Sequence, residues 1–286
     1  MEAIKLYWQD ILSRLLVQVE EPWLERKVQG LLERGQKVER ATFFIQPYHR
    51  VTYEEIREIT YSLMIRLYIK DIHKSYVEEG VYHCQATINR GNILEQSTLT
   101  ENILPKDKVR LAPQFLNKEW GGDRATFYYD RREAIRYAEQ WWDNYNPAFQ
   151  NFDVDCTNYI SQCLHAGGAP MWGQSNRSKG WWHGNNNWSY SWSVAHSLRW
   201  YLSGSRQGLV ASEVSEASQL SLGDVICYDF QGDGRYDHTT IVVSKTSQGE
   251  PLVNAHTTNS RQRFWDYTDS TAYTPNIDYK FFHIGS

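Results

Sequence analysis

Two segments of the chain carry residue types that together could attack and release an acyl group. The first, residues 155–162, reads DCTNYISQ and places a cysteine at the start of a helical pattern. The second, about eighty residues later, reads YDHTTIVV over 236–243 and places a histidine at the start of a β-branched strand. A helix N-terminus favours a thiolate, and an adjacent imidazole can take up and return a proton. The two segments predict nucleophilic catalysis with Cys156 as nucleophile and His238 as base.

A catalytic histidine needs a partner that fixes which of its ring nitrogens carries the proton. The predicted strand after that of His238 carries Asn254 and His256, two residues apart. Residues two apart on a strand point to the same face, so either could orient His238. The residue pattern alone leaves both alternatives open.

These residues also have simpler structural interpretations. A cysteine on a helix is most often a small buried apolar residue, and we assign that role to Cys163, two turns after Cys156. The polar neighbours Asp155 and Thr157 distinguish Cys156, although Asp155 is equally suited to cap the helix. The other polar residues of this helix are interpreted as packing or hydrogen-bonding residues: Asn158, Ser161 and Gln162.

The elements that must position these side chains belong to the second of two predicted domains, residues 126–286. It opens with an amphipathic helix over 130–142, which Asp130 can cap, and the cysteine helix follows and ends at Gly167-Gly168. The remaining chain alternates short strands with turns. Helices followed by antiparallel strands indicate an α+β domain.

The first domain is predicted over residues 1–105. A helical pattern runs from Lys5 to about Arg34, and segments with strand composition follow at 42–45, 59–69 and 81–88. We expect a small α+β domain with an antiparallel sheet, and its sequence does not indicate a role. Residues 106–125 have the composition of a linker.

As a set, the motifs of the second domain resemble the bacterial family described as putative amidase domain, which is related to the CHAP and NlpC/P60 cysteine peptidases. The resemblance covers roughly residues 128–283 and is carried by DCTNYISQ, by GDVI at 223–226, by the Asp237-His238 strand and by NAHT at 254–257. It implies a papain-like fold of the NlpC/P60 type and hydrolysis of amide bonds, with peptidoglycan peptides as the usual substrate of the related families.

The resemblance also implies roles for individual residues. Cys156 corresponds to the nucleophile and His238 to the base. The amidase-type pattern favours His256 as third catalytic residue, whereas the NlpC/P60 pattern would place Asn254 there, and we favour His256. In such a mechanism Cys156 forms an acyl-enzyme, and backbone N–H groups at the start of its helix bind the oxyanion.

Six of the twelve tryptophans fall between Trp172 and Trp200, in and after a loop rich in Asn, Gly and Ser. The loop either fastens itself to the domain through its own aromatic rings or forms a wall for a peptide or glycan substrate. In the second case the substrate-binding residues would be Trp181, Trp182, Asn186 and Trp188.

Two other functions compete with the cysteine hydrolase. A metal hydrolase would use Asp237, His238 and His256 as ligands, but no HExxH or similar pair supports it. The segment 229–237 resembles a calcium loop only faintly, because it lacks the terminal Glu. The main alternative is a non-catalytic cell-wall or glycan-binding module that uses the Trp-rich loop. We expect no metal and no cofactor.

The bulk composition excludes some classes of partner. A net charge of −4 and an isoelectric point near 6.1 give no general cationic surface, so we expect no nucleic acid partner. No apolar stretch approaches the roughly 20 residues of a membrane span. The four cysteines fit neither a zinc site nor a disulfide framework, and no secretory signal is recognisable, so we expect reduced thiols in the cytoplasm. The expected partner is a peptide or peptidoglycan fragment.

Overall fold

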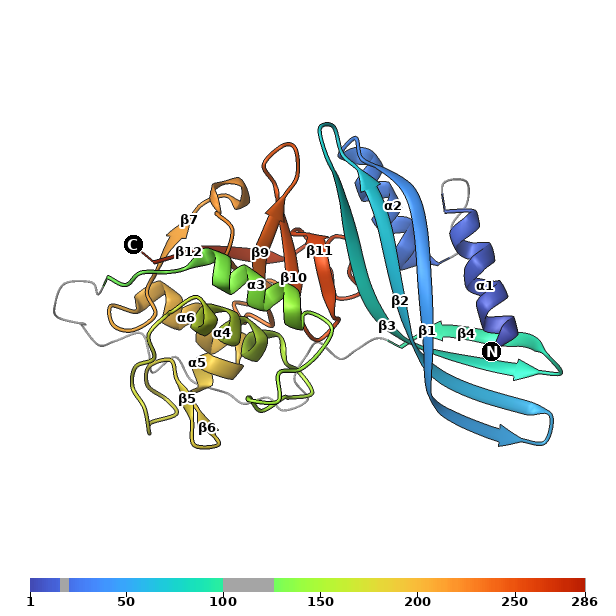
Figure 1. The fold of residues 1–286 in the computed structure, drawn as a ribbon, viewed down its shortest axis with the longest axis horizontal. Coiled ribbons are helices and arrows are strands. Elements are labelled where there is room, and N and C mark those ends of the chain that lie inside the picture. Colours follow the sequence, from blue (N-terminus) through green and yellow to red (C-terminus); the bar gives the residue numbers. More distant parts are fainter. Residues whose placement is uncertain (16–20, 100–125, 286) are drawn as a thin grey trace. The chain divides into compact units, whose positions relative to one another are not determined.

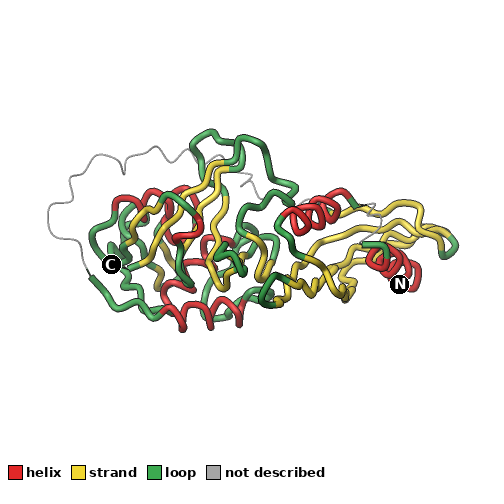
Figure 2. Tube along the Cα trace, turned by 90° about the horizontal axis from the view of Figure 1, so that it is seen from above, coloured by secondary structure: helices red, strands yellow, loops and turns green. Residues whose placement is uncertain are grey.

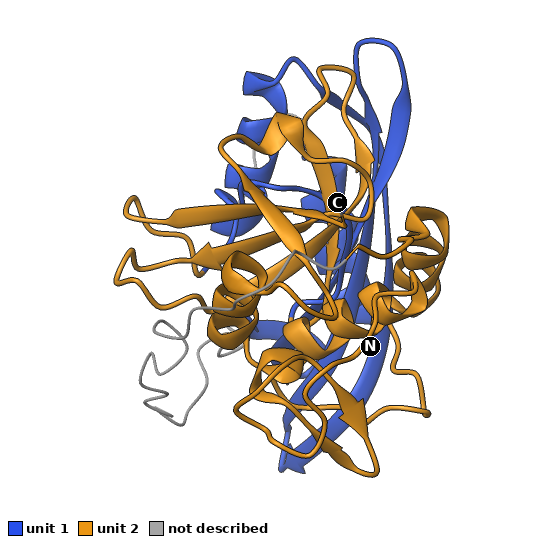
Figure 3. Ribbon diagram, turned by 90° about the vertical axis from the view of Figure 1, so that its left-hand side faces the viewer, with its two compact units in different colours: residues 1–101, 258–271 blue, residues 102–257, 272–286 orange. Residues whose placement is uncertain are grey.

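The computed structural model describes residues 1–15, 21–99 and 126–285, which form two compact units (Figures 1 and 3). The described part of the first unit comprises residues 1–15, 21–99 and 258–271, and that of the second comprises 126–257 and 272–285. The predicted linker, residues 106–125, lies outside the described residues. We expected a second domain without interruption from 126 to 286, but the structure assigns 258–271 to the first unit.

Within the described residues, the first unit has two helices and five strands (Figure 2). Strand β2 lies between β1 and β3, while β4 and β11 pair with different parts of β3, and all these pairs are antiparallel. The elements are α1 (Glu2–Ser13), α2 (Pro22–Glu33), β1 (Lys37–Tyr53), β2 (Ile56–Lys70), β3 (Ser75–Asn89), β4 (Asn92–Thr98) and β11 (Ser260–Phe264).

The alternation of side chains along β2 directs one face of this sheet toward both helices. Every second residue from Ile59 to Ile69 is buried. On the same face, Trp8 Nε1 of α1 donates to the Tyr61 hydroxyl (2.8 Å), and the Trp23 ring of α2 lies 4.2 Å from that of Tyr82. This face is the core of the first unit.

A buried group of charged side chains, the Lys27 network, attaches segment 258–271 to the first unit. Lys27 of α2 pairs with Glu78 of β3 and with Asp269 (Nζ to Oδ2, 2.6 Å), and Arg263 of β11 also pairs with Asp269 (Nη2 to Oδ1, 2.8 Å). Burial alone would lower the pKa of Lys27, but Asp269 and Glu78 outweigh burial and raise this pKa above its ordinary value. The network therefore explains why this segment belongs to the first unit.

In the second unit the larger sheet has the antiparallel order β10-β9-β8-β12-β7. Its elements are α3 (Arg131–Trp141), α4 (Cys156–Ala166), β5 (His183–Gly184), β6 (Asn187–Trp188), α5 (Tyr190–Ser193), α6 (Ala195–Gly204), β7 (Ala211–Val214), the 3₁₀ turn Ala217–Gln219, β8 (Val225–Asp229), β9 (His238–Lys245), β10 (Pro251–Ala255) and β12 (Asp278–Ile284).

Helices α3, α4 and α6 pack on the face of this sheet that carries Ile241 of β9. Ile241 stands opposite Val225 of β8, and two residues earlier Thr239 stands opposite Cys227. The side chains of Val225, Cys227 and Ile241 are buried in the same apolar core as those of the helices. The opposite face carries the alternate residues, which include His238 and Thr240.

The structure confirms an α+β protein and most of the elements expected in the second unit. Asp130 caps α3 by accepting the N–H groups of Arg132 and Glu133, and α4 begins at Cys156 and ends at Ala166, just before Gly167. The short strands β5, β6 and β7 of the second unit and β4 and β11 of the first were not expected. Within the described segments, no helix is both long enough and apolar enough to cross a bilayer.

Candidate active site

Cys156 is the first residue of α4, and its side chain is almost fully buried, with 2% of the residue exposed. Burial raises the pKa of the Cys156 thiol, while the Thr157 hydroxyl and the backbone of Thr239 act in the opposite direction. The direction of this shift is opposite to the one that we expected from the helix macrodipole, and burial is its largest cause. The resting thiol is therefore protonated and needs a base.

Asp155 precedes Cys156 and lies at the N-cap position of α4, but its carboxylate interacts with three other groups. Its Oδ1 accepts the N–H of Phe152 (2.9 Å) and the side-chain amide of Asn158 (2.9 Å). Its Oδ2 lies 2.9 Å from Nδ1 of His256. The interpretation of Asp155 as a helix cap thus holds for its position, whereas its side chain connects α4 to the end of β10.

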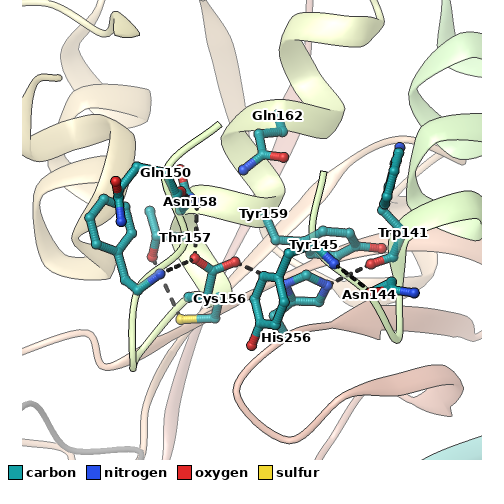
Figure 4. Close-up of polar contacts among 12 residues, drawn as sticks. Trp141, Asn144, Tyr145, Gln150, Cys156, Thr157, Asn158, Tyr159, Gln162 and His256 are labelled. Carbon is teal, nitrogen blue, oxygen red and sulfur yellow. Dashed lines mark hydrogen bonds and ion pairs between the residues drawn. The ribbon is translucent and has the colours of Figure 1, made fainter. Parts of the chain in front are cut away.

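His256 is held on every side by the second unit. Its Nε2 lies 2.6 Å from the carbonyl oxygen of Trp141, at the end of α3. Its ring stacks on that of Tyr159 with centroids 4.0 Å apart and planes 12° apart, and the edge of Tyr145 approaches it at 5.2 Å. Figure 4 shows the ring between these partners. Both ring nitrogens are thereby engaged with partners other than His238.

His238 is the first residue of β9, stands opposite Tyr228, and is buried. Its ring lies 5.5 Å from the Tyr228 ring. The next residue, Thr239, points to the helices, where its hydroxyl lies 3.2 Å from that of Thr157. The structure thus brings the start of α4 against the start of β9. The Cys156 sulfur itself lies 3.7 Å from the Thr157 hydroxyl.

Asn254, the alternative third residue, lies on β10, and its side-chain amide donates to Glu139 of α3 (Nδ2 to Oε1, 3.0 Å). Asn254 stands opposite Ile241, which places it on the face covered by the helices, where His256 also lies. The two residues therefore share a face, as we expected from their spacing. The contact with Glu139 fastens β10 to α3.

The other polar residues of α4 have the packing roles expected of them. The Ser161 hydroxyl donates to the carbonyl of Trp192 (2.8 Å), Asn158 Oδ1 accepts from the Trp192 indole (2.8 Å), and Gln162 accepts from the Tyr137 hydroxyl (2.6 Å). These bonds fix α4 to α3 and α5, so the position of Cys156 is closely defined.

The Trp-rich loop is fastened to the domain by its own rings. Trp181 is fully buried and donates to the Ser161 hydroxyl (2.9 Å), and Trp182 is buried with its indole N–H on the carbonyls of Asn176 and Lys179 (3.2 and 3.1 Å). Neither ring offers a face to a ligand in this structure. Of the four predicted substrate-binding residues, Asn186 is exposed and Trp188 is half-buried.

Asn185 and Asn186 form the turn of the β5–β6 hairpin, and both have positive φ (50° and 53°). Two successive residues in the left-handed region are typical of a type I′ turn, which Asn adopts readily. Trp188, the last residue of this hairpin, packs its ring against that of Phe152, with the ring centroids 4.9 Å apart. Because Phe152 donates to Asp155, the accessible part of the loop connects directly with the Cys156 helix.

The segment compared with a calcium loop is a turn built around Asp229. Its Oδ1 accepts the N–H groups of Gly232 and Asp233 (2.8 and 3.3 Å), and its Oδ2 accepts that of Gly234 (2.7 Å). These bonds occupy the carboxylate that would have to bind a cation. Within the described segments, no group of three or more His, Cys, Asp or Glu side chains is arranged to hold a metal ion.

Asp237, beside His238, has a strongly altered acidity. Burial, together with the nearby carboxylates of Asp229 and Asp233, raises the pKa of Asp237 to about 7. Its Oδ2 is buried without a hydrogen-bond partner among the described residues. The sequence marked Asp237 as a neighbour of the base and as a ligand in the metal-hydrolase alternative. Its raised pKa was not predicted, because it depends on how the turn brings Asp229 and Asp233 close to it.

The Gly223-Asp224 motif has a structural role that sequence reasoning missed. The buried Asp224 pairs with Arg131 of α3 (Oδ1 to Nη1, 2.6 Å) and with His283 of β12 (Oδ2 to Nδ1, 2.8 Å), and it accepts the N–H of Ile284 (3.0 Å). The second unit thus contains a second Asp–His pair, Asp224–His283, which belongs to a clamp between α3 and the last strand.

The part of the chain that carries these residues matches a known family. Residues 128–282, a little over half of the chain, match the family described as putative amidase domain, and the chain belongs to this family. The family match includes Cys156, His238 and His256.

Two curated relatives come from Bacillus subtilis (strain 168). The uncharacterized protein YhbB is 61% identical over 158 residues, which are 55% of this chain and 51% of YhbB. The uncharacterized protein YjcM is 32% identical over 140 residues, which are 46% of this chain and 31% of YjcM. The chain thus spans about half of YhbB and less of YjcM. No solved structure matches it significantly.

Proposed function

We propose that this protein is a cysteine-dependent amidase or peptidase with a papain-like second domain, acting on peptides of the peptidoglycan type. Membership of the amidase-domain family supports amide hydrolysis. The observation that carries the proposal is the contact between Thr157 and Thr239 (3.2 Å), because each is the residue directly after a predicted catalytic residue. Cys156 and His238 are therefore the first residues of a helix, α4, and a strand, β9, whose second residues are in contact.

In the proposed mechanism, His238 removes the thiol proton as Cys156 sulfur attacks the carbonyl carbon of the scissile amide. The carbonyl oxygen becomes an oxyanion, which the unpaired N–H groups in the first turn of α4 stabilise. Collapse of this intermediate breaks the C–N bond, and His238 returns the proton to the departing amine. Water then attacks the thioester and regenerates the Cys156 thiol.

The raised pKa of Cys156 assigns His238 an active part in this scheme. Because burial raises the pKa of the thiol, attack by Cys156 requires a base that takes up its proton. In this structure the His238 ring lies beside Tyr228, on the sheet face opposite to that of Thr239. The proposal therefore includes a rearrangement of the start of β9 that brings this ring to the side of Cys156 when substrate binds. Hydrogen bonds between catalytic groups are commonly long before substrate arrives.

The test combines hydrolysis with thiol labelling. Purified wall peptides are incubated with the wild type, Cys156→Ala and His238→Ala, and new amino groups are measured by mass spectrometry. We expect loss of activity in both variants and no effect of a chelator. A chelator-sensitive activity that survives in Cys156→Ala would overturn the proposal. Wall binding without hydrolysis by the wild type would favour a binding module.

Iodoacetamide labelling adds an internal control, because Cys163 and Cys227 are buried thiols of the same unit and burial raises the pKa of both. With substrate fragments present, Cys156 should be labelled at least tenfold faster than either, and His238→Ala should abolish the difference. Equal rates at the three thiols would contradict an activated Cys156.

A further inference from the structure

The strongest additional signal lies in the partners of His256. Its Nδ1 faces the Asp155 carboxylate (2.9 Å), and its Nε2 faces the Trp141 carbonyl (2.6 Å). A carbonyl oxygen can only accept a hydrogen bond, and Asp155 already accepts two through its other oxygen. A neutral imidazole between a carboxylate and a carbonyl would direct its lone pair at an oxygen in a buried site, which is costly.

Two arrangements of one proton satisfy these contacts: an imidazolium beside a carboxylate, or a neutral imidazole beside a protonated Asp155. Three features favour the first. The N–H of Phe152 and the amide of Asn158 both donate to Asp155, which stabilises its charged form. Asp155 also lies at the N-terminal end of α4, where the helix dipole favours negative charge. Finally, the Tyr159 ring covers the imidazole face to face, a geometry that attracts a cation.

We propose that His256 is held as an imidazolium and acts as a positioning residue, which neutralises Asp155 and fixes the first turn of α4 around Cys156. This inference rests on the proposed function only in naming Cys156 as the nucleophile. A histidine that donates through both nitrogens cannot accept a hydrogen bond from His238, so its role differs from that of an orienting third catalytic residue.

The cation has a direct consequence for the thiol. Asp155 is covalently adjacent to Cys156, and an uncompensated carboxylate there would oppose formation of the thiolate. Glu139, a carboxylate on α3, accepts a hydrogen bond from Asn254. His256 is thus the cation that lies against Asp155, and it contacts α4 both before and after Cys156, through Asp155 and Tyr159.

The Asp224–His283 pair is a matched control within the same unit. Its histidine also faces an Asp through Nδ1, but its Nε2 lies 3.3 Å from Nη2 of Arg131, which can only donate. His283 should therefore be neutral, with the proton on Nδ1. The two pairs have the same residue types and opposite hydrogen-bonding requirements at Nε2.

The first measurement is ¹⁵N NMR of the histidine rings in the full chain, with His256→Gln and His283→Gln for assignment. Near pH 7.5 we expect protons on both nitrogens of His256 and only on Nδ1 of His283. A lone pair on either nitrogen of His256 would overturn the proposal, and one on Nδ1 would identify Asp155 as the protonated partner. This result does not depend on whether Cys156 is catalytic.

The second measurement is the pH dependence of Cys156 labelling. In His256→Gln the midpoint should rise by about one pH unit, because Asp155 is left uncompensated. The double variant Asp155→Asn/His256→Gln, which removes both charges, should recover most of that shift, whereas His283→Gln should leave the wild-type midpoint unchanged. A double variant no better than His256→Gln would show that His256 acts through packing alone. If wild-type Cys156 labels no faster than Cys163, the proposed function fails and NMR alone decides the state of His256.

Discussion

The two units bury ionic groups in different ways. In the first, the Lys27 network joins two cations and two carboxylates from three separate segments of the chain. In the second, Asp155 and His256 form a single pair whose remaining hydrogen bonds go to uncharged groups on α3, on α4 and in the loop before α4. The first arrangement closes the fold around a distant piece of chain, while the second lies beside a reactive thiol.

The difference shows what a buried charge can contribute. A network that neutralises itself and touches no reactive group contributes to stability and to the choice of one fold. A pair next to Cys156 changes the electrostatic potential at the sulfur, whatever it adds to stability. Substitutions in the first unit should therefore change unfolding and spare thiol chemistry, whereas those at Asp155–His256 should change thiol chemistry as well as stability.

The largest effect on stability is expected for Lys27→Met. Removing the cation leaves Glu78 without its partner and weakens the compensation of Asp269, and breaking a buried ionic group in this way typically costs about 3–5 kcal/mol. Urea unfolding measures the loss. Arg90→Met is the control, because the exposed Arg90–Glu55 pair should contribute less than about 1 kcal/mol. A change in the Cys156 labelling rate of the folded Lys27→Met protein would break the comparison.

Asp224→Asn should destabilise the second unit by about 2 kcal/mol, because a neutral amide cannot satisfy Arg131, His283 and the N–H of Ile284 together. The urea midpoint should fall, while the pH profile of Cys156 labelling in the folded protein stays as in the wild type. A shifted labelling profile would mean that the Asp224–His283 pair also affects the reactivity of Cys156, and not only the stability of the second unit.

Asp237 predicts a dependence of stability on pH. Because its pKa in the folded protein is about 7, above the ordinary 3.8, the folded state binds this proton more tightly than the unfolded state. The resulting stabilisation is complete below about pH 4 and is lost as the pH rises through 7. At pH 8 the free energy of unfolding of Asp237→Asn, measured by urea unfolding, should therefore exceed that of the wild type by about 1 kcal/mol. At pH 5 this difference should be smaller. Equal differences at the two pH values would contradict the raised pKa.

The smallest effect on stability is expected for Trp188→Ala, since Trp188 is half-buried. If the accessible part of the Trp-rich loop binds substrate, this variant should raise KM severalfold with little change in kcat or urea midpoint. Trp181→Ala is the contrasting variant and should unfold far more easily, since its ring is fully buried. An unchanged KM in Trp188→Ala would remove the loop from the substrate site.

Local patterns predicted the elements that carry the site. The cap at Asp130, the start of α4 at Cys156 and the β-branched strand after His238 each depend on neighbouring residues, and each agrees with the structure. The partner of His256 could not be predicted in this way, because it depends on where the loop before α4 brings Asp155. The same holds for the Lys27 network and for the bond between Arg261 and Glu79, which are far apart in sequence.

The return of residues 258–271 to the first unit has a consequence for how this protein can be divided. The family match, 128–282, contains β11 and Asp269, although both belong structurally to the first unit. A fragment beginning at residue 126 would carry β11 without β3 and Asp269 without Lys27. Truncation or shuffling at the apparent family boundary would therefore remove part of the first unit from the rest of it. A fragment meant to fold must take into account that the chain passes from the second unit to the first after Thr257.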